Sequence, residues 1–478
     1  MAGSASTSRR VFKALRIFGS VQAVGILCSV VRAKCIALWL GPAGVGIFGL
    51  YNSALEVLNQ LVQLNLRQSG VREISCASGA RSSFLSAVVR RLGCLLGVVG
   101  ALLTLLLSTF LSRLTFGDDT HTLPFMLLSV VVFCNALIAG EQAVLQANSL
   151  FRRLARASLW GSVVATAIAV CLIRFWGFDA IVPSIITFGV VTAIAYRVGR
   201  SSVPRVSMTR REFTSASLPL LKLGVYMTAA VFTTMLAQYA FLAWLRSEGG
   251  EDAAGIYQSG YTIVTQYVGL VFTALAVEFF PRVSAVISSR MRTSLFVRHE
   301  LSMLLWGLLG AIVLFVSLVP FIIRLLYDST FLPVSDYVTI ASVGTVFKAF
   351  SFVLAIVIIA RGDGRIYLLT ETVSSVLYFL LSIVGYRCGA LQGLGVAYIV
   401  WYALYALSVF LVYRFRYRLT GLRRPSVLAL GVIIAVAAQV ALCLEDCYPA
   451  ATVVSCLVVP FAGFMFYRLF LNRRTLKE

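Results

Sequence analysis

Long hydrophobic segments separated by short polar stretches run through almost the whole chain. A helix needs about 20 mostly apolar residues to cross a bilayer core of roughly 30 Å. We assign such segments to residues 17–40, 44–66, 85–110, 123–147, 158–173, 180–196, 220–244, 255–280, 301–323, 337–360, 367–385, 394–412, 427–443 and 448–467. Strands of a transmembrane barrel would instead alternate over about ten residues. The pattern predicts an all-α, polytopic membrane protein with about 14 transmembrane helices, of which 158–173 and 427–443 are short.

The composition excludes a soluble protein. Of the 478 residues, 59% are hydrophobic and only 13% are charged, and the mean hydropathy is +0.91. Soluble domains carry about 25% charged residues. The polar residues here are too few to cover a folded chain of this length, so much of its surface must face lipid. The sequence therefore predicts a transporter, and a membrane scaffold that transports nothing is the other non-enzymatic class considered.

The positions of lysine and arginine predict the orientation in the membrane. With the N-terminus inside, the outside segments contain Arg113, Arg174, Arg246, Arg324 and Arg387. Five more basic residues lie within hydrophobic segments, namely Arg32, Lys34, Arg90, Arg91 and Lys348, which leaves 31 of the 41 inside. Cytoplasmic loops are enriched in such residues. Both termini are therefore expected in the cytoplasm, in a bacterial inner membrane, and the net charge of +22 reflects topology instead of nucleic-acid binding.

A weak internal repeat divides the chain. The stretch Gly46–Tyr51 resembles the later stretch Gly255–Tyr261, and the fourth to sixth segments resemble the tenth to twelfth at a similar offset. Six helices separate the copies, which predicts a parallel repeat as in some transporters. We expect a lobe over 1–219, a second lobe over 220–420 and an added helix pair over 421–478. The alternative is that any two glycine-bearing apolar helices look alike.

Polar residues within the hydrophobic segments are the candidate functional residues, because charges at bilayer depth usually face a cavity or each other. The candidates for binding a substrate are Arg32, Lys34, Gln60, Lys222, Gln258 and Lys348, and those for ion coupling are Glu56, Glu141 and Glu371. Lys348 is the hardest to explain structurally, since it lies mid-segment without a local acid.

Structural explanations compete for several of these residues. Lys34 and Glu56 could pair to join two helices, and Glu371 could pair with Arg365. Lys222 lies near the inner surface, where its long side chain could extend to the headgroups.

Several cations lining one cavity would favour an anionic substrate such as a phosphate. A face of Asn, Gln, Thr and Tyr would suit the hydroxyl groups of sugars. A phosphate-binding Gly-Lys-Ser/Thr loop and paired catalytic carboxylates are absent from the sequence, so neither an ATPase nor another enzyme is predicted. The two histidines and ten cysteines show no metal-binding spacing, so no metal or cofactor is expected. Cys443 and Cys447 could in principle form a disulfide.

Three regions carry a resemblance to a known family. Residues 34–75 contain Gly41-Pro42-Ala43-Gly44-Val45-Gly46, a later region contains Phe279-Phe280-Pro281-Arg282-Val283-Ser284, and residues 343–372 include Lys348 and Glu371. In their order and spacing these regions resemble bacterial polysaccharide flippases of the Wzx type, in the O-antigen and enterobacterial-common-antigen subgroup. These flippases belong to the multidrug/oligosaccharidyl-lipid/polysaccharide superfamily.

The resemblance implies a two-lobed, twelve-helix protein that moves an undecaprenyl-pyrophosphate-linked oligosaccharide to the periplasmic leaflet by alternating access. It implies basic residues at Lys34, Lys222 and Lys348, and membrane lipids, a polysaccharide polymerase and chain-length regulators as partners. The added helix pair departs from that pattern and also occurs in lipid II flippases. A lipid II flippase is therefore one alternative, and a multidrug or small-molecule antiporter of the superfamily is the other.

The predicted topology places residues 245–254 outside and Ser207 in the cytoplasm. In a cysteine-free protein, we expect an impermeant thiol reagent added outside to label Ser247→Cys but not Ser207→Cys, and to label both after the membrane is permeabilised. Outside labelling of the Ser207→Cys protein alone would show that the topology is inverted.

Overall fold

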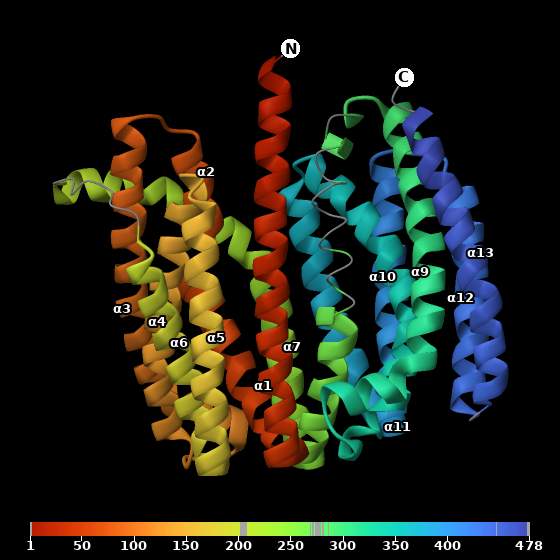
Figure 1. The fold of residues 1–478 in the computed structure, drawn as a ribbon, viewed down its shortest axis with the longest axis horizontal. Helices are drawn as coiled ribbons and strands as arrows, with labels where there is room; N and C mark the ends of the chain where they lie inside the picture. Colours follow the sequence, from red (N-terminus) through yellow and green to blue (C-terminus); the bar gives the residue numbers. More distant parts are fainter. Residues whose placement is uncertain are drawn as a thin grey trace. The chain divides into compact units, whose positions relative to one another are not determined.

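Helices account for the regular structure. The computed structural model describes residues 2–200, 208–267 and 286–475 except 446, together with 269, 272, 279 and 282–284 (Figure 1). Within these residues every regular element is helical, which confirms the all-α prediction. Ser207 and part of the Phe279–Ser284 motif lie outside the described residues.

The main helices follow one another with short connections. They are α1 (Ala2–Gln63), α2 (Leu66–Ser75), α3 (Ala80–Phe116), α4 (Thr122–Ala147), α5 (Phe151–Trp176), α6 (Ile181–Val198), α7 (Arg210–Thr262), α9 (Arg290–Leu326), α10 (Val334–Ala360), α11 (Gly364–Leu411), α12 (Arg423–Leu444) and α13 (Tyr448–Thr475).

Three of these helices contain a break where the sequence predicts a boundary between two segments. In α1 the break is at Gly41, with φ 64° and ψ −163°, followed by Pro42. In α7 it is at Gly250, with φ 80° and ψ −178°. In α11 it is at Gly389 and Ala390. A positive φ is favourable for glycine and interrupts the ladder of hydrogen bonds in α1 and α7. A kink thus divides each of the three long helices into two parts.

Nine stretches of the described chain are long and apolar enough to span a membrane. Three of them, Val24–Ser75, Phe151–Val198 and Gly364–Arg416, each overlap two predicted segments. The chain is thus a multi-pass membrane protein, while the count of fourteen helices stays a prediction. The segments that looked short are longer in the structure, with 26 residues in α5 and 22 in α12. Both helices have arginines in their first turn, and a search for apolar runs leaves these residues out. They fit a membrane helix because the arginine stem can lie along the helix while the charge reaches water.

The helix boundaries recur along the chain with nearly constant spacing. Gly250 follows Gly41 at the same offset by which Gly255 follows Gly46 in the sequence repeat. Helices α3 and α9 each have 37 residues, and their starting points are separated by almost the same offset. The starting points of α4 and α10 are separated by a similar one. The repeat is therefore seen in the positions of the helix boundaries, although the residue-by-residue similarity of the two copies is weak.

The chain forms two compact units, Met1–Gly255 and Ile256–Glu478. The predicted boundaries at 219/220 and 420/421 stay predictions. In the N-terminal unit α3 packs along α4, and α5 along both α1 and α6 (Figure 1). Gly93 allows the close approach of α3 to α4, because a Cβ there would lie 3.0 Å from the carbonyl oxygen of Ala136.

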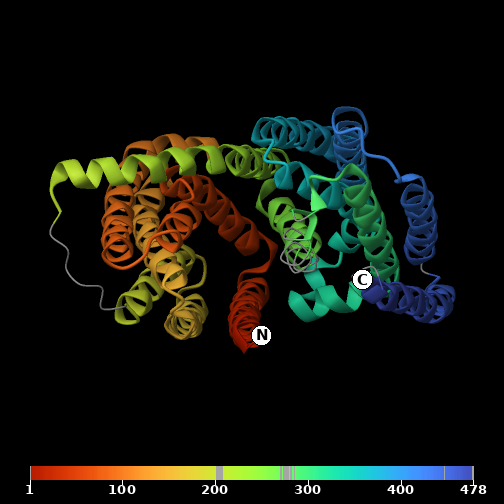
Figure 2. The same ribbon diagram turned by 90° about the horizontal axis from the view of Figure 1, so that it is seen from above.

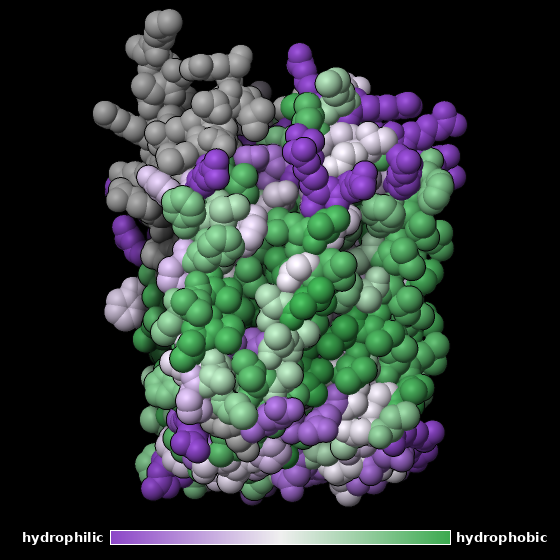
Figure 3. Space-filling model, turned by 90° about the vertical axis from the view of Figure 1, so that its right-hand side faces the viewer, coloured by the Kyte–Doolittle hydropathy of each residue, from purple (hydrophilic) through white to green (hydrophobic). Residues whose placement is uncertain are grey.

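In the C-terminal unit α12 and α13 pack against α9, and α12 also contacts α10 (Figure 2). The face of this unit seen in Figure 3 shows a wide band of hydrophobic side chains between two hydrophilic ends, as expected of a surface in contact with lipid. Cys443 and Cys447 are both free thiols in the structure.

Gln439 links α12 to its neighbours. Its side chain is fully buried, and its Nε2 donates to the Ser317 hydroxyl at 2.7 Å, the Ala451 carbonyl at 3.0 Å and the Ser455 hydroxyl at 3.2 Å. Away from water, polar groups that lose their partners are costly. The contacts thus attach the C-terminal pair to α9 by hydrogen bonds as well as by apolar packing.

We expect Gln439→Ala to destabilise the purified protein by about 1–3 kcal/mol, because it removes the buried hydrogen bonds to Ser317, Ala451 and Ser455. Ile434→Ala is the control on the same helix, since Ile434 is 62% exposed. Unfolding monitored by tryptophan fluorescence in detergent would measure both. Equal losses of stability would show that these hydrogen bonds do not hold the helix pair.

Candidate functional site

Lys348 is an isolated cation in the C-terminal unit. It lies near the middle of α10, with its Nζ 5.3 Å from the ring centre of Tyr402 and 5.8 Å from that of Phe272. No described residue forms an ion pair or a side-chain hydrogen bond with it. Cation–π contacts of this kind stabilise a charge only in part. A lysine at this depth therefore leaves a positive field for an anionic ligand.

A cluster of aromatic side chains adjoins this lysine through Tyr402. We call Tyr257, Tyr261, Tyr337, Tyr378, Tyr398, Trp401 and Tyr402 the tyrosine cluster. Its rings pack closely, for example at 4.2 Å between the centres of Trp401 and Tyr402. The hydroxyls of Tyr257 and Tyr378 lie 2.8 Å apart, and the Trp401 indole donates to the carbonyl of Ser374 at 2.9 Å.

Within this cluster, Tyr261 and Tyr402 are partly exposed while the other five members are buried. The buried rings thus hold the two exposed ones in fixed positions. A fixed aromatic ring with a hydroxyl group presents both an apolar face and a hydrogen-bonding edge. That combination suits a ligand such as a sugar, which has both C–H faces and hydroxyls.

Two other candidate residues, Glu371 and Gln258, belong to the same unit as Lys348. The carboxylate of Glu371, near the start of α11, accepts a hydrogen bond from the Tyr405 hydroxyl. It forms no ion pair within the described chain, so the alternative of a pair with Arg365 is wrong: the carboxylate points to an aromatic hydroxyl of the second part of α11. Gln258, in the same unit, is half-buried, one turn before the end of α7.

Arg32 occupies an aromatic site in the N-terminal unit. Its guanidinium lies 5.1 Å from the ring centre of Phe48 and 4.5 Å from that of Phe188. It has no hydrogen bond or ion pair to the described residues. Phe48 follows the break at Gly41, so the turn of the chain places both halves of α1 around this cation. Lys34 is half-buried, and Lys222 is exposed on α7.

The proposed pair of Lys34 with Glu56 is not formed. Glu56 is exposed and makes no ion pair or hydrogen bond with described residues. The break at Gly41 lies between the two residues and redirects the chain, which sequence spacing does not reveal. Four residues after Glu56, the Gln60 Nε2 is buried and has no hydrogen-bond partner in the described part of the chain. Glu56 and Gln60 are thus polar groups that the fold leaves available.

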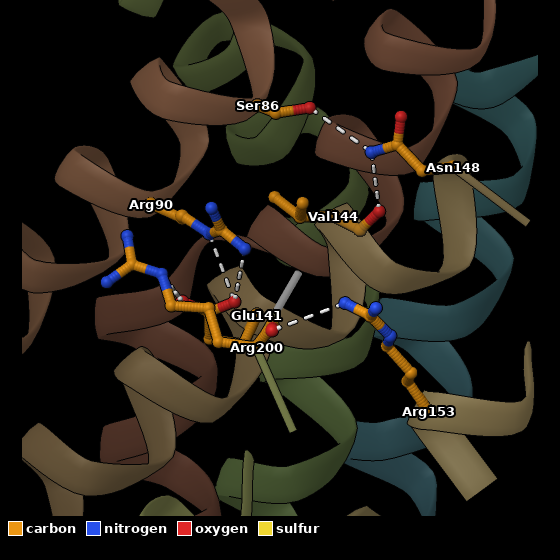
Figure 4. Close-up of polar contacts among 7 residues, drawn as sticks. All are labelled: Ser86, Arg90, Glu141, Val144, Asn148, Arg153 and Arg200. Atoms are coloured by element: carbon orange, nitrogen blue, oxygen red, sulfur yellow. Dashed lines mark hydrogen bonds and ion pairs between the residues drawn. The ribbon is translucent and has the colours of Figure 1, made fainter. Parts of the chain in front are cut away.

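Glu141 lies in an ion-pair network. Its carboxylate is 3.0 Å from the guanidinium of Arg90 on α3 and 3.3 Å from that of Arg200, just after α6 (Figure 4). The Arg90 side chain is 8% exposed and that of Glu141 is 14% exposed. Glu141 therefore neutralises a buried arginine. This is a structural role, whereas the sequence analysis gave Glu141 as a candidate for ion coupling.

Sequence reasoning missed the tyrosine cluster, although a signal for it exists. Tyr398, Trp401, Tyr402 and Tyr405 follow one another at spacings of three, one and three residues, which places them on one helical face. The pairing of Arg90 with Glu141 joins residues 51 apart and leaves no such signal.

The fold is shared with membrane transporters of known structure. A lipid II flippase, MurJ, in an inward closed conformation matches with a TM-score of 0.70 at 14% identity, over 96% of this chain and all of that one. An inward-facing multidrug transporter of the MATE family and MOP superfamily matches with a TM-score of 0.66 at 16% identity, over 85% of this chain and 95% of that one. These likenesses define the class: a multi-pass α-helical membrane protein with the fold of that superfamily.

The sequence itself gives the family. Residues 36–336 match the family model described as polysaccharide biosynthesis protein. The chain belongs to this family. A lipid III flippase of Escherichia coli strain K12 is 23% identical over 400 residues, which is 80% of this chain and 94% of that protein. A lipid III flippase of Shigella flexneri matches to the same extent.

We expect Glu141→Gln to lower the free energy of unfolding by about 3 kcal/mol, because it leaves the buried Arg90 without a countercharge. Asp119→Asn is the control, since it breaks the exposed pair with Arg113 and should have little effect. Both would be compared by unfolding in detergent. If Glu141→Gln unfolds like the wild type, the network does not stabilise the fold, and the residue is free to bind a proton.

Proposed function

We propose that this protein is a flippase that transfers a polyprenyl-pyrophosphate-linked oligosaccharide from the cytoplasmic to the periplasmic leaflet by alternating access. Membership in the polysaccharide biosynthesis family supports the class of cargo, and the relatives named lipid III flippases support the transfer of a lipid-linked molecule. The observation that carries the proposal to the residue level is Lys348, a cation beside aromatic rings without an acidic partner in the described chain.

In this proposal the pyrophosphate, the sugars and the polyprenyl chain of the ligand each have different surroundings. Lys348 attracts the pyrophosphate, with Arg32, Lys34 and Lys222 as further basic contacts, because a charge in a low-dielectric site acts strongly on an anion. Tyr261 and Tyr402 contact the sugars, as do Gln60 and Gln258. The polyprenyl chain stays in lipid, so the protein never has to enclose it.

The carboxylates are proposed to couple transport to an ion. Glu56 is the best placed of the three candidates, because it has no ion pair or hydrogen bond within the described chain. Glu371 is hydrogen-bonded to Tyr405, and Glu141 already balances two arginines. The proposed cycle contains no covalent step, so the protein is proposed to be a transporter and not an enzyme.

Two finer assignments belong to the same proposal. The cargo is the repeating unit of an O-antigen or a related surface polysaccharide, and polymerase and chain-length regulator proteins act beside the flippase. The protein lies in the bacterial inner membrane with both termini in the cytoplasm.

A lipid II flippase is the second candidate. The fold likeness to MurJ covers 96% of this chain, whereas the likeness to the multidrug transporter covers 85%. Both flippase candidates share a polyprenyl pyrophosphate that carries a saccharide, and they differ in the glycan. An antiporter for small molecules is disfavoured, because its cavity would be acidic or apolar. Complementation of strains that lack each flippase would separate the glycans.

The charge on Lys348 provides the test of the proposed function. We expect Lys348→Ala to abolish complementation of a flippase-deficient strain, with an affinity loss of about 10- to 150-fold for one charge-assisted contact. Lys348→Arg should keep part of the function, because it keeps the charge but changes its geometry. Lys348→Glu should be worse than alanine, since it adds repulsion.

The matched control is Arg365→Ala, which removes an exposed cation from the neighbouring helix α11. It should leave complementation unchanged, and immunoblots of membranes would confirm equal amounts of all variants. Normal glycan export by a well-expressed Lys348→Ala protein would remove the residue-level support for an anionic lipid cargo.

A further inference from the structure

A cavity next to the Glu141 network contains more positive than negative charge. It has a volume of about 190 Å³ and lies between α4 and α6, with Arg90 of α3 at one side. Arg90 and Arg197 line it together with Glu141. The carboxylate of Glu141 also pairs with Arg200 (Figure 4). Glu141 is the one acidic residue among the described residues of this lining. Arg90 and Arg200 therefore share one carboxylate, and Arg197 adds a third positive charge at the cavity.

Arg197 and Arg200 are the two arginines of this group that lie exposed at the surface. Arg90 is almost fully buried and already forms the ion pair with Glu141. Arg197 is exposed at the end of α6, and no described residue forms a hydrogen bond or an ion pair with it. Arg200 has a 45% exposed side chain, so part of its guanidinium remains open to another partner. Arg197, which lines the cavity, and Arg200, three residues later, are thus the two guanidiniums at this end of α6 that an anion can contact.

The rest of the cavity wall is apolar. Leu137 and Ile138 of α4 face Val190, Ala193 and Ile194 of α6 across it. Ile194 is 56% exposed, although it belongs to a stretch long and apolar enough to span a membrane. An exposed apolar side chain in such a stretch contacts acyl chains. The cavity therefore joins a basic rim to a wall that faces lipid.

We propose that this cavity binds an anionic phospholipid from the leaflet at the end of α6, with its phosphate on Arg197 and Arg200 and an acyl chain against Val190 and Ile194. Guanidinium groups bind phosphate through paired, charge-assisted hydrogen bonds. Basic pockets between transmembrane helices recognise lipid headgroups in this way. The positive-inside distribution of charge puts this end in the cytoplasmic leaflet.

Such a lipid would differ in role from the transported one. The site lies wholly within the N-terminal unit and includes none of the residues proposed to hold the cargo. It does include Glu141, which was a candidate for ion coupling. With Glu141 retained by Arg90, the phosphate would take over the charge of Arg200. The bound lipid would thereby fasten α3, α4 and α6 together, and Arg153 adds a contact from α5 through the carbonyl of Arg200 at 3.5 Å.

Native mass spectrometry of the full-length protein in detergent, titrated with phosphatidylglycerol, tests the site. We expect one high-affinity lipid on the wild type and at least tenfold weaker binding to Arg197→Gln and to Arg200→Gln. Ile194→Trp should weaken binding without a change of charge, because the indole fills the cavity. Arg152→Gln is the matched control, since it removes an exposed arginine from the same end of the unit but not from the cavity.

Each other outcome would overturn the proposal in a defined way. Equal losses in Arg152→Gln and Arg197→Gln would indicate general surface electrostatics. Equally tight binding of phosphatidylcholine would show that the net charge is not recognised. Full competition by millimolar inorganic phosphate would indicate a soluble-anion site, and displacement by stoichiometric undecaprenyl phosphate would assign the cavity to the transported lipid. A Lys348→Ala protein should bind phosphatidylglycerol normally, which separates this site from the proposed function.

Discussion

Backbone hydrogen bonding in lipid constrains this structure more than any other interaction. A chain that crosses the hydrocarbon core has no water to satisfy its amides, so each crossing must bond internally as a helix. The interruptions in α1, α7 and α11 accordingly occur between hydrophobic segments, and the first two use glycines with a positive φ. The spacing of these two glycines reproduces the offset of the sequence repeat. The same turn chemistry therefore marks corresponding points of both copies.

Once the helices exist, the location of charge is the next constraint. A buried ion is costly unless it is paired. Three of the basic residues within the hydrophobic segments have different surroundings. Arg90 is neutralised by Glu141, Arg32 lies against two phenylalanine rings, and Lys348 lies beside aromatic side chains without an ion pair to the described residues. The paired arginine has a structural role. The two cations beside aromatic rings are among those proposed to contact the anionic part of the cargo.

The hydrogen bonds of the C-terminal helix pair attach it to the rest of its unit and involve no candidate binding residue. Gln439 attaches α12 to α9 and α13 through three hydrogen bonds, and these helices carry no candidate binding residue. The pair thus has its own means of attachment. The pair departs from the twelve-helix pattern that the resemblance implies, and the likeness to MurJ extends over 96% of this chain.

The sequence by itself determined the helical class, the membrane location and the places where the chain turns. It did so because the length of an apolar segment is fixed by the thickness of the bilayer and because glycines with a positive φ allow the breaks in α1 and α7. It also identified Lys348, Glu141 and Glu371 as unusual charges. Only the tertiary structure decided what they contact. Glu141 meets Arg90 and Arg200, Glu371 meets Tyr405, and Glu56 does not meet Lys34. Successive residues turn by about 100° around a helix, so a partner depends on how each helix is rotated and packed. Packing between residues far apart in the chain sets that rotation, and no local spacing encodes it.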